Sequence, residues 1–308
     1  MNTMSAGPTD SPTGPHPEGV ARLLVIATGI AAAVALSIAR PASVLGQLPS
    51  VSGPIQHARG QNVAPVYEGW YRGRDGTINV SFGYLNKNYE EAVDIPIGPG
   101  NRIEPGPVDR GQPTHFLPRR HWGVFVVTLP KDHPKTAEVT WTLTVRGRTE
   151  TVPANLSELY LVDALEHVGG TDEGTTPPVL KLDPAGASAL GPAGLSKTLN
   201  ATVGRPLPLQ VWVADEHRGQ NAKSGEAPPR QQSPFSVIWS VYRGPAAVRF
   251  GDPRPPVADG TAKTDATFSE PGDYTLRVAA LRGTRFSGQC CWTNGYVSVK
   301  VGAGTTRP

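Results

Sequence analysis

The chain has 308 residues, enough for one to three domains, and only 18% of them are charged. Glycine and proline are frequent (35 Gly and 32 Pro), which is typical of a turn-rich, all-β protein with irregular loops. The formal net charge is only +3 and no long block of lysine and arginine occurs, so we expect no nucleic-acid partner.

Residues 1–46 predict an export segment. Arg22 precedes an uncharged apolar run of 17 residues, 23–39. Val44 and Gly46 then supply the small residues expected before a signal-peptide cleavage site, which would follow Gly46. A membrane span needs about 20 apolar residues, so a short uncleaved anchor over 23–39 stays open beside the cleaved signal. Both interpretations predict an exported protein (periplasmic, cell-surface or secreted) that meets the membrane only through this segment.

A short linker, 47–63, leads into a first predicted β-sandwich domain over 64–153. In its first hairpin Ile78, Val80 and Phe82 alternate with polar residues, and an Asp-Gly pair marks the preceding turn. Further short runs bounded by proline and glycine bring the total to about six strands, the density of a sandwich or barrel.

A connector, 154–176, separates this domain from the next one. Its segment 155–167 has a helix-like pattern, with Asn155 as the candidate N-cap and leucines near one face. A second predicted sandwich domain then covers 177–302, and a short tail, 303–308, ends the chain. The second domain is interrupted by a polar, proline-rich insertion, 216–234, which cannot build a core of its own.

The stretch "TFSEPGDYTLRVAA", which begins at Thr267, resembles the E–F corner of immunoglobulin-like and PKD-like modules in exported bacterial proteins. Tyr274 takes the place of the corner tyrosine, whose hydroxyl bonds back to the nearby backbone. Trp239, in "VIWSVYR", matches the buried tryptophan of strand C. The resemblance covers about 177–302 and extends more loosely to the first half through "WTLTVRG". It implies two consecutive immunoglobulin-like, antiparallel β-sandwiches after the N-terminal apolar segment.

The resemblance also implies where an inter-sheet disulfide would lie. The position two residues after Tyr274 is Leu276, and the strand-B partner falls among Leu209, Val211 and Val213. Apolar side chains therefore replace this bridge.

The chain has two cysteines, Cys290 and Cys291, which are adjacent. An exported protein favours disulfides, but neighbouring Cα atoms are about 3.8 Å apart, or 2.9 Å across a cis peptide, and ordinary bridges need roughly 4.4–6.8 Å. Three interpretations stay open. The first is a vicinal disulfide in a turn-like backbone, which would stiffen the loop or act as a redox-sensitive switch. The second is two unpaired thiols, and the third is a bond to a metal or to another molecule.

One polar cluster and one aromatic pair are candidate ligand surfaces. His115, Arg119, Arg120 and His121 could grip an anion or a metal, but we favour the alternative that they are solvated positive side chains that blunt a strand edge. Trp70 and Tyr71, with neighbouring tyrosines, could stack on a sugar, and the alternative is that they fill the core.

No catalytic constellation is found: the sequence lacks a nucleophile elbow, a phosphate-binding glycine loop and a spaced carboxylate pair. We expect no cofactor and no metal. The first hypothesis is a non-enzymatic cell-envelope or secreted protein that binds or scaffolds an unidentified protein or glycan partner. The alternatives are a carbohydrate-binding accessory protein and a metal- or redox-linked periplasmic protein that uses Cys290 and Cys291.

Overall fold

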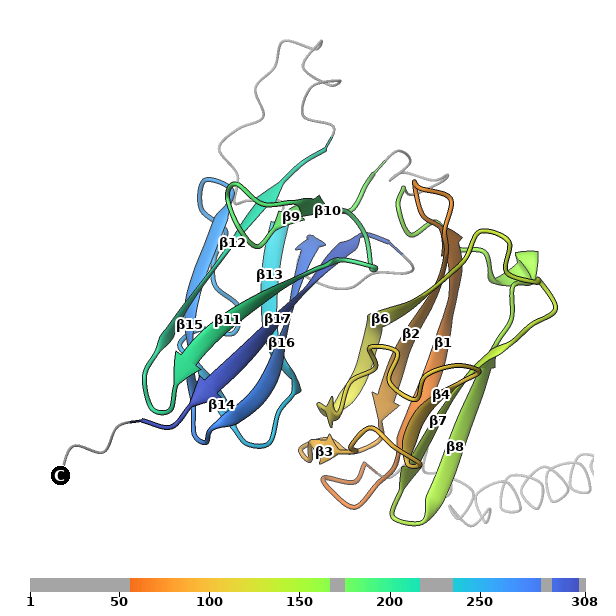
Figure 1. Ribbon diagram of the computed structural model, residues 1–308, viewed down its shortest axis with the longest axis horizontal. Helices are drawn as coiled ribbons and strands as arrows, with labels where there is room; N and C mark the ends of the chain where they lie inside the picture. The colour runs from red at the N-terminus through yellow and green to blue at the C-terminus, as the bar shows by residue number, and fades with distance from the viewer. Residues whose placement is uncertain (1–55, 167–174, 217–234, 284–289, 305–308) are drawn as a thin grey trace, which may run out of the picture. The chain divides into compact units, whose positions relative to one another are not determined.

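The computed structural model describes residues 56–166, 175–216, 235–283 and 290–304, and these are organised almost entirely as β-strands (Figure 1). Contacts group Gln56–Pro308 as one compact unit. The predicted signal or anchor lies outside the described residues, as do nearly all of the polar insertion and part of the connector. Among the residues that are described, no helix is long and apolar enough to cross a membrane.

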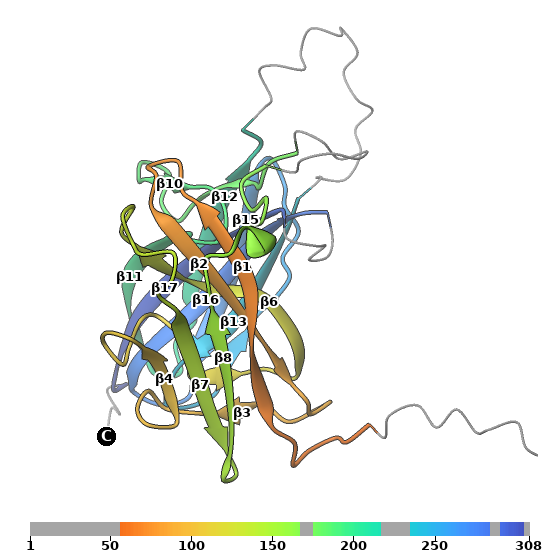
Figure 2. The same ribbon diagram turned by 90° about the vertical axis from the view of Figure 1, so that its right-hand side faces the viewer.

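The first half of this unit contains two three-stranded antiparallel sheets and a small two-stranded one. The sheet orders are β1-β2-β6, β4-β7-β8 and β3-β5, and Figure 2 shows the first two in face view. The predicted hairpin is present: β1 pairs with β2 in a register that places Arg72 opposite Ile78. The strands are β1 (Val63–Arg72), β2 (Ile78–Asn86), β3 (Val93–Asp94), β4 (Asn101–Glu104), β5 (His115–Phe116), β6 (Arg119–Leu129), β7 (Val139–Val145) and β8 (Arg148–Ala154).

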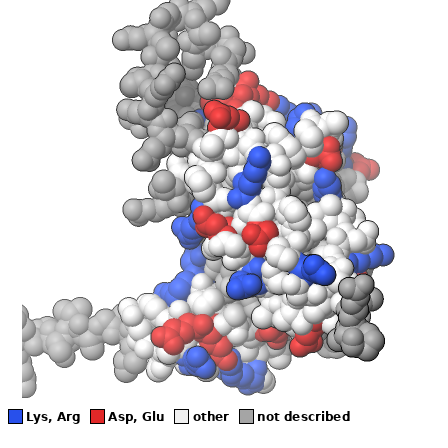
Figure 3. All heavy atoms as spheres, turned by 90° about the vertical axis from the view of Figure 1, so that its left-hand side faces the viewer, with Lys and Arg blue, Asp and Glu red and all other residues white. Residues whose placement is uncertain are grey.

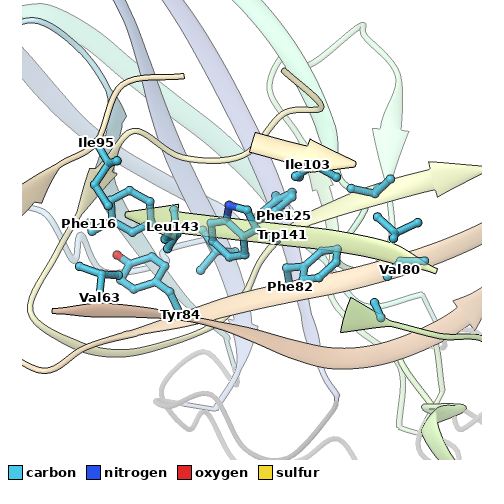
Figure 4. Packing of buried hydrophobic residues seen from close by; sticks show 14 of the residues in the cluster. Val63, Val80, Phe82, Tyr84, Ile95, Ile103, Phe116, Phe125, Trp141 and Leu143 are labelled. Atoms are coloured by element: carbon cyan, nitrogen blue, oxygen red, sulfur yellow. The ribbon is translucent and has the colours of Figure 1, made fainter. Parts of the chain in front are cut away.

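Alternating apolar residues of these strands meet in one core, shown in Figure 4. Phe82 of β2 stacks on Phe125 of β6 at 5.3 Å, and Trp141 of β7 meets both rings edge-on. The indole Nε1–H of Trp141 donates to Asn101 Oδ1 at 3.1 Å, so the polar edge of this buried ring is satisfied. The three rings therefore join the two larger sheets of this half.

The second half is a two-sheet sandwich with immunoglobulin-like strand order. One sheet has the order β10-β9-β12-β15-β14 and the other β11-β17-β16-β13. The strand β11 pairs with β17 in parallel, a feature that the sequence pattern did not predict, while the other pairs are antiparallel. The strands are β9 (Val179–Lys181), β10 (Ser188–Ala189), β11 (Leu195–Thr202), β12 (Leu207–Ala214), β13 (Phe235–Arg243), β14 (Val248–Phe250), β15 (Thr261–Phe268), β16 (Gly272–Arg282) and β17 (Trp292–Gly302).

The features that carried the resemblance lie where it places them. The Tyr274 hydroxyl donates to the carbonyl of Glu270 at 2.9 Å and forms the corner. Trp239 lies in β13, is 3% exposed and belongs to the core between the sheets. Leu276 and Val211 are fully buried in the same core, where the usual inter-sheet disulfide would be. The all-β, immunoglobulin-like fold predicted from the sequence is confirmed.

In 155–166, the described part of the helix-like segment, the chain forms only one 3-10 turn, η1 (Glu158–Tyr160), which is capped by Ser157 rather than Asn155. A longer helix would need a core to cover its leucines, but Leu159 is 91% exposed. The chain instead runs on in extended form, and the backbone amide of Val162 donates to the Trp70 carbonyl at 2.9 Å.

Candidate functional site

The Cys290–Cys291 pair lies between β16 and β17, and the structure joins the two sulfurs in a disulfide across a cis peptide. Cys290 is buried and Cys291 is half-buried. The carbonyl oxygen of Thr175 lies 3.5 Å from Cys291 Sγ and 3.9 Å from Cys290 Sγ. The pair thus packs against the segment that enters the second sandwich.

Arg282, at the end of β16, binds this entering segment to the sandwich. Its guanidinium donates to the Thr176 carbonyl at 3.0 Å and to both carboxylate oxygens of Asp215 at 3.0 and 3.2 Å. Its backbone amide donates to the carbonyl of Cys291 at 3.1 Å. Bidentate arginine–carboxylate pairs are geometrically specific. The pair of Arg282 with Asp215 therefore helps to fix the position of the segment that contacts the disulfide.

The residues that follow the disulfide contact the first half of the protein. Trp292 is buried and its ring packs directly against Gly123 of β6. The Asn294 side chain donates to the Gly123 carbonyl at 2.9 Å and to the Pro192 carbonyl at 2.7 Å. The vicinal cysteines are therefore one residue away from the contact between the two sandwiches.

Arg277 of β16 is buried at the same contact. Its guanidinium donates to Asn294 Oδ1 at 2.8 and 3.0 Å and to the Gly123 carbonyl at 3.2 Å. Burial lowers the pKa of Arg277, and burial raises the pKa of the neighbouring Tyr296 to about 12. The Tyr296 hydroxyl donates to the Val124 carbonyl at 2.8 Å, which adds another bond between the halves.

A second set of contacts joins the halves at the end of β13. Arg243 donates to both carboxylate oxygens of Asp109 at 2.8 and 2.9 Å and to the Gln112 carbonyl. The Tyr242 hydroxyl donates to the Gly111 carbonyl. The two sets of contacts are neighbours on the sheet that contains β13 and β16, because the ring centres of Tyr242 and Tyr296 lie 5.3 Å apart.

The predicted ligand residues are divided among different environments. Trp70 and Tyr71 are 2% and 3% exposed, so their ring faces are not available for stacking on a sugar. The Trp70 Nε1–H donates to the Ser157 carbonyl at 2.8 Å, and the Tyr71 hydroxyl accepts from the Ala193 amide at 3.0 Å.

The cationic residues at the start of β6 are engaged with rings and with one acid. The Arg119 guanidinium lies 3.8 Å from the Tyr89 ring centre. Arg120 pairs with Glu68 at 2.7 Å and lies over the Trp122 ring at 3.8 Å.

His121 stacks on Tyr84, with 4.8 Å between ring centres, and its Nε2–H donates to the Pro118 carbonyl at 3.0 Å. Burial lowers the pKa of His121 to about 4. The neutral ring therefore serves packing at neutral pH.

His115 is separate from these residues, in β5, where its Nδ1 lies 2.7 Å from Asp94 Oδ1. It lines a cavity together with Trp239. Within the described ranges, no group of three or more histidine, cysteine, aspartate or glutamate side chains could hold a metal ion.

Two features of the site were missed from the sequence. Arg277 follows Leu276 in a run of buried residues, and a charged side chain inside an apolar strand was the available signal. The cavity beside Trp239 depends on residues of both sandwiches, so no local sequence pattern indicates it.

Charged side chains of both signs are interspersed over the face of the second sandwich seen in Figure 3.

The comparisons with known proteins show likeness at the level of structure. No family model and no curated protein matches the sequence. Among solved structures, the chain is similar to domains 4 and 5 of the S-layer protein SbsC, with 13% identity, a TM-score of 0.23, and coverage of 58% of this chain and 70% of that one. It is also similar to the D0-D1 domain of intimin, with 14% identity, a TM-score of 0.24, and coverage of 78% and 98%. A third is titin A168169, with 12% identity, a TM-score of 0.23, and coverage of 78% and 99%.

Proposed function

We propose that this protein is an exported, non-enzymatic binding or scaffolding module of the cell envelope, in which two sandwiches act as one platform. The observation that carries the proposal is the buried polar contact between the sandwiches. Asn294 and Arg277 of the second sandwich both bond to the Gly123 carbonyl of the first, away from water. Buried hydrogen bonds of this kind are costly to leave unmade, so they favour one relative orientation.

A fixed orientation suits a protein that presents a surface to a partner. Independent domains that only space two ends apart need no buried contact between them. The same contact offers no chemistry of its own: Arg277 is enclosed, and the hydroxyls of Tyr242 and Tyr296 donate to backbone carbonyls. The side chains at this contact thus serve to join the halves.

Export is tested first with a reporter. The full chain and a chain that lacks residues 1–46 are each fused at the C-terminus to β-lactamase and expressed in a bacterial host. We expect ampicillin resistance only from the full chain, because the enzyme protects cells only outside the cytoplasm. Equal resistance, or resistance from neither at equal expression, would contradict export by this segment.

Binding is tested on the exported protein. A photoreactive amino acid is placed at exposed positions such as Val108 and Leu159, and cells are irradiated. We expect a discrete cross-linked species to form from some of these positions, those on the surface that contacts the partner, and not from the others. A binding role would be contradicted if no position gave a cross-link and if the protein, purified by two independent routes, still catalysed a reaction.

A further inference from the structure

The strand β11 is an open edge of the second sandwich. It lies at the end of the sheet β11-β17-β16-β13, and within the described part of the chain it pairs with β17 alone (Figure 1). Its eight residues keep one unbroken register, from Leu195 opposite Gly295 to Thr202 opposite Gly302. The row of backbone groups on the other side of an edge strand is a template for pairing with another strand.

The residues of β11 that present their backbone to this open side can be identified. The amide of Val203, directly after β11, donates to the Gly302 carbonyl of β17 at 3.0 Å. The N–H and C=O groups of successive residues point to opposite sides of a strand. Ser196, Thr198 and Asn200 therefore direct both groups away from β17, and no described residue forms a backbone hydrogen bond with them on that side.

The other edge strands of the described sheets each have a feature that hinders pairing. Short strands, bulges, prolines and charged side chains are the usual devices. The strands β3, β5 and β10 have two residues each, β14 has three and β4 has four. A register shift interrupts the pairing of β1, β6 and β13 with their neighbours. The strand β8 contains Arg148, Glu150 and Pro153. Among these edges, β11 is therefore the long and regular one.

Lys197 is the one charged residue of β11, and a lysine can protect an edge strand from pairing. Its Nζ, however, donates to the Leu182 carbonyl at 3.1 Å and to Asp183 Oδ2 at 2.8 Å. The charge is thus compensated within the sandwich. The exposed side chains of β11 are uncharged: Ser196, Thr198, Asn200 and Thr202.

We propose that β11 pairs with β11 of a second copy of this chain, in an antiparallel dimer with Thr198 on the two-fold axis. Thr198 then lies opposite Thr198 of the second copy, and Ser196 lies opposite Asn200. Each of the three open residues meets another open residue, so the two strands exchange about six backbone hydrogen bonds. The sheets of the two copies become one continuous sheet.

The side chains of β11 suit pairing with an identical strand. A symmetric pair places each residue against its own symmetry mate, so like charges would repel. In this register the exposed face contains only hydroxyl and amide side chains. On the other face Leu195 lies opposite Ala201, and Leu199 lies opposite the stem of Lys197. Leu195, Leu199 and Ala201 are half-buried against the core, so the second copy covers apolar surface that one copy leaves partly exposed.

The register is tested by cross-linking the full chain with Thr198→Cys or Thr202→Cys. Opposite Cα atoms in a hydrogen-bonded antiparallel pair are about 5.5 Å apart, which a disulfide can span. Thr202 is the matched control because it is exposed on the same face of the same strand. Its two copies would lie about 26 Å apart, since they are separated by eight residues along the strand direction. The native cysteines are already joined to each other.

Both variants are oxidised with copper phenanthroline in air and separated on a non-reducing gel. We expect Thr198→Cys to form a covalent dimer at least about tenfold faster than Thr202→Cys, because only the first geometry permits the bond. Equal rates in the two variants would overturn the inference.

The free energy of pairing is tested by sedimentation velocity of the full chain from about 5 to 500 µM. Thr198→Lys places two like charges opposite each other and should weaken the dimer several-fold, whereas Thr202→Lys adds the same charge away from the axis and should leave it unchanged. Thr198→Pro removes an amide that makes no bond to β17, as an edge strand tolerates, and should weaken the dimer at least about tenfold. Circular dichroism checks that each variant is folded.

A monomer at every concentration would overturn the inference. A dimer with the same dissociation constant in wild type, Thr198→Lys and Thr198→Pro would also overturn it, because the copies would then associate through another surface. The inference goes beyond the proposed function, since it requires neither export nor a foreign partner. A monomer that the reporter shows to be exported contradicts only the dimer, and a dimer whose reporter stays in the cytoplasm contradicts only the proposed function.

Discussion

Gly123 is the residue at which the contact between the sandwiches can be tested most sharply. Its φ is +45°, and a Cβ built there would overlap Cζ2 of the Trp292 ring and lie 2.7 Å from Cε2. A side chain at positive φ costs about 1–2 kcal/mol, and overpacking a close contact costs about 1–3 kcal/mol more. Gly123→Ala should therefore lower the free energy of unfolding by about 2–5 kcal/mol, and Tm by roughly 5–15 °C for a unit of this size.

Gly204→Ala separates the two contributions to this cost. Gly204 has φ +72°, but no atom lies within 4 Å of the position that its Cβ would take. It should lose only the backbone cost of about 1–2 kcal/mol. Urea unfolding of both variants, followed by circular dichroism and tryptophan fluorescence, measures the difference. Equal losses in the two variants would refute the idea that Trp292 packs tightly on Gly123 and joins the halves.

Three further predictions concern single residues. Intact mass of the non-reduced chain should be lower than that of the reduced chain by two hydrogens, and alkylating reagent should label Cys290 and Cys291 only after reduction; labelling before reduction would show free thiols. The pKa of His121 is about 4 in the folded chain and about 6.5 in the unfolded chain. The neutral ring therefore contributes about 3 kcal/mol to the free energy of unfolding above pH 6.5, and this contribution is lost as the pH falls toward 4. His121→Phe should make the free energy of unfolding in urea less dependent on pH over that window, and an unchanged pH profile would contradict this. Tyr274→Phe removes the bond to the Glu270 carbonyl and should cost about 1 kcal/mol in the same assay, whereas no loss would show that the corner bond adds nothing.

The sequence predicted the second sandwich well because its signals are local. Tyr274 and Trp239 lie at fixed offsets within short strands, and alternation alone sends Leu276 into the core. The first hairpin was also predictable, because its Asp-Gly turn lies between two alternating runs. The helix pattern at 155–167 failed because periodicity reports which face is apolar and not whether a core exists to cover it.

The candidate site was much harder to predict, since it is built from residues that are distant in the chain. Trp70 and Tyr71 resemble exposed aromatics in the sequence, yet Ser157 and Ala193 satisfy their polar atoms in the interior. Asp94 lies in β3 and Trp239 in β13, so no spacing connects them. Such groupings depend on how the two halves pack, which single-sequence patterns do not encode.

The disulfide, the contact between the sandwiches and the cavity lined by Asp94 and Trp239 are physically linked. Trp292 follows Cys291 directly and packs on Gly123, so the position of the disulfide fixes where that ring can lie. The same contact sets the distance between the first sandwich, which supplies Asp94, and the second, which supplies Trp239. A groove with walls from two domains has a constant shape only if the domains keep one orientation. The cavities that both sandwiches line therefore keep one shape only while the buried bonds of Asn294 and Arg277 to the Gly123 carbonyl hold the two halves together.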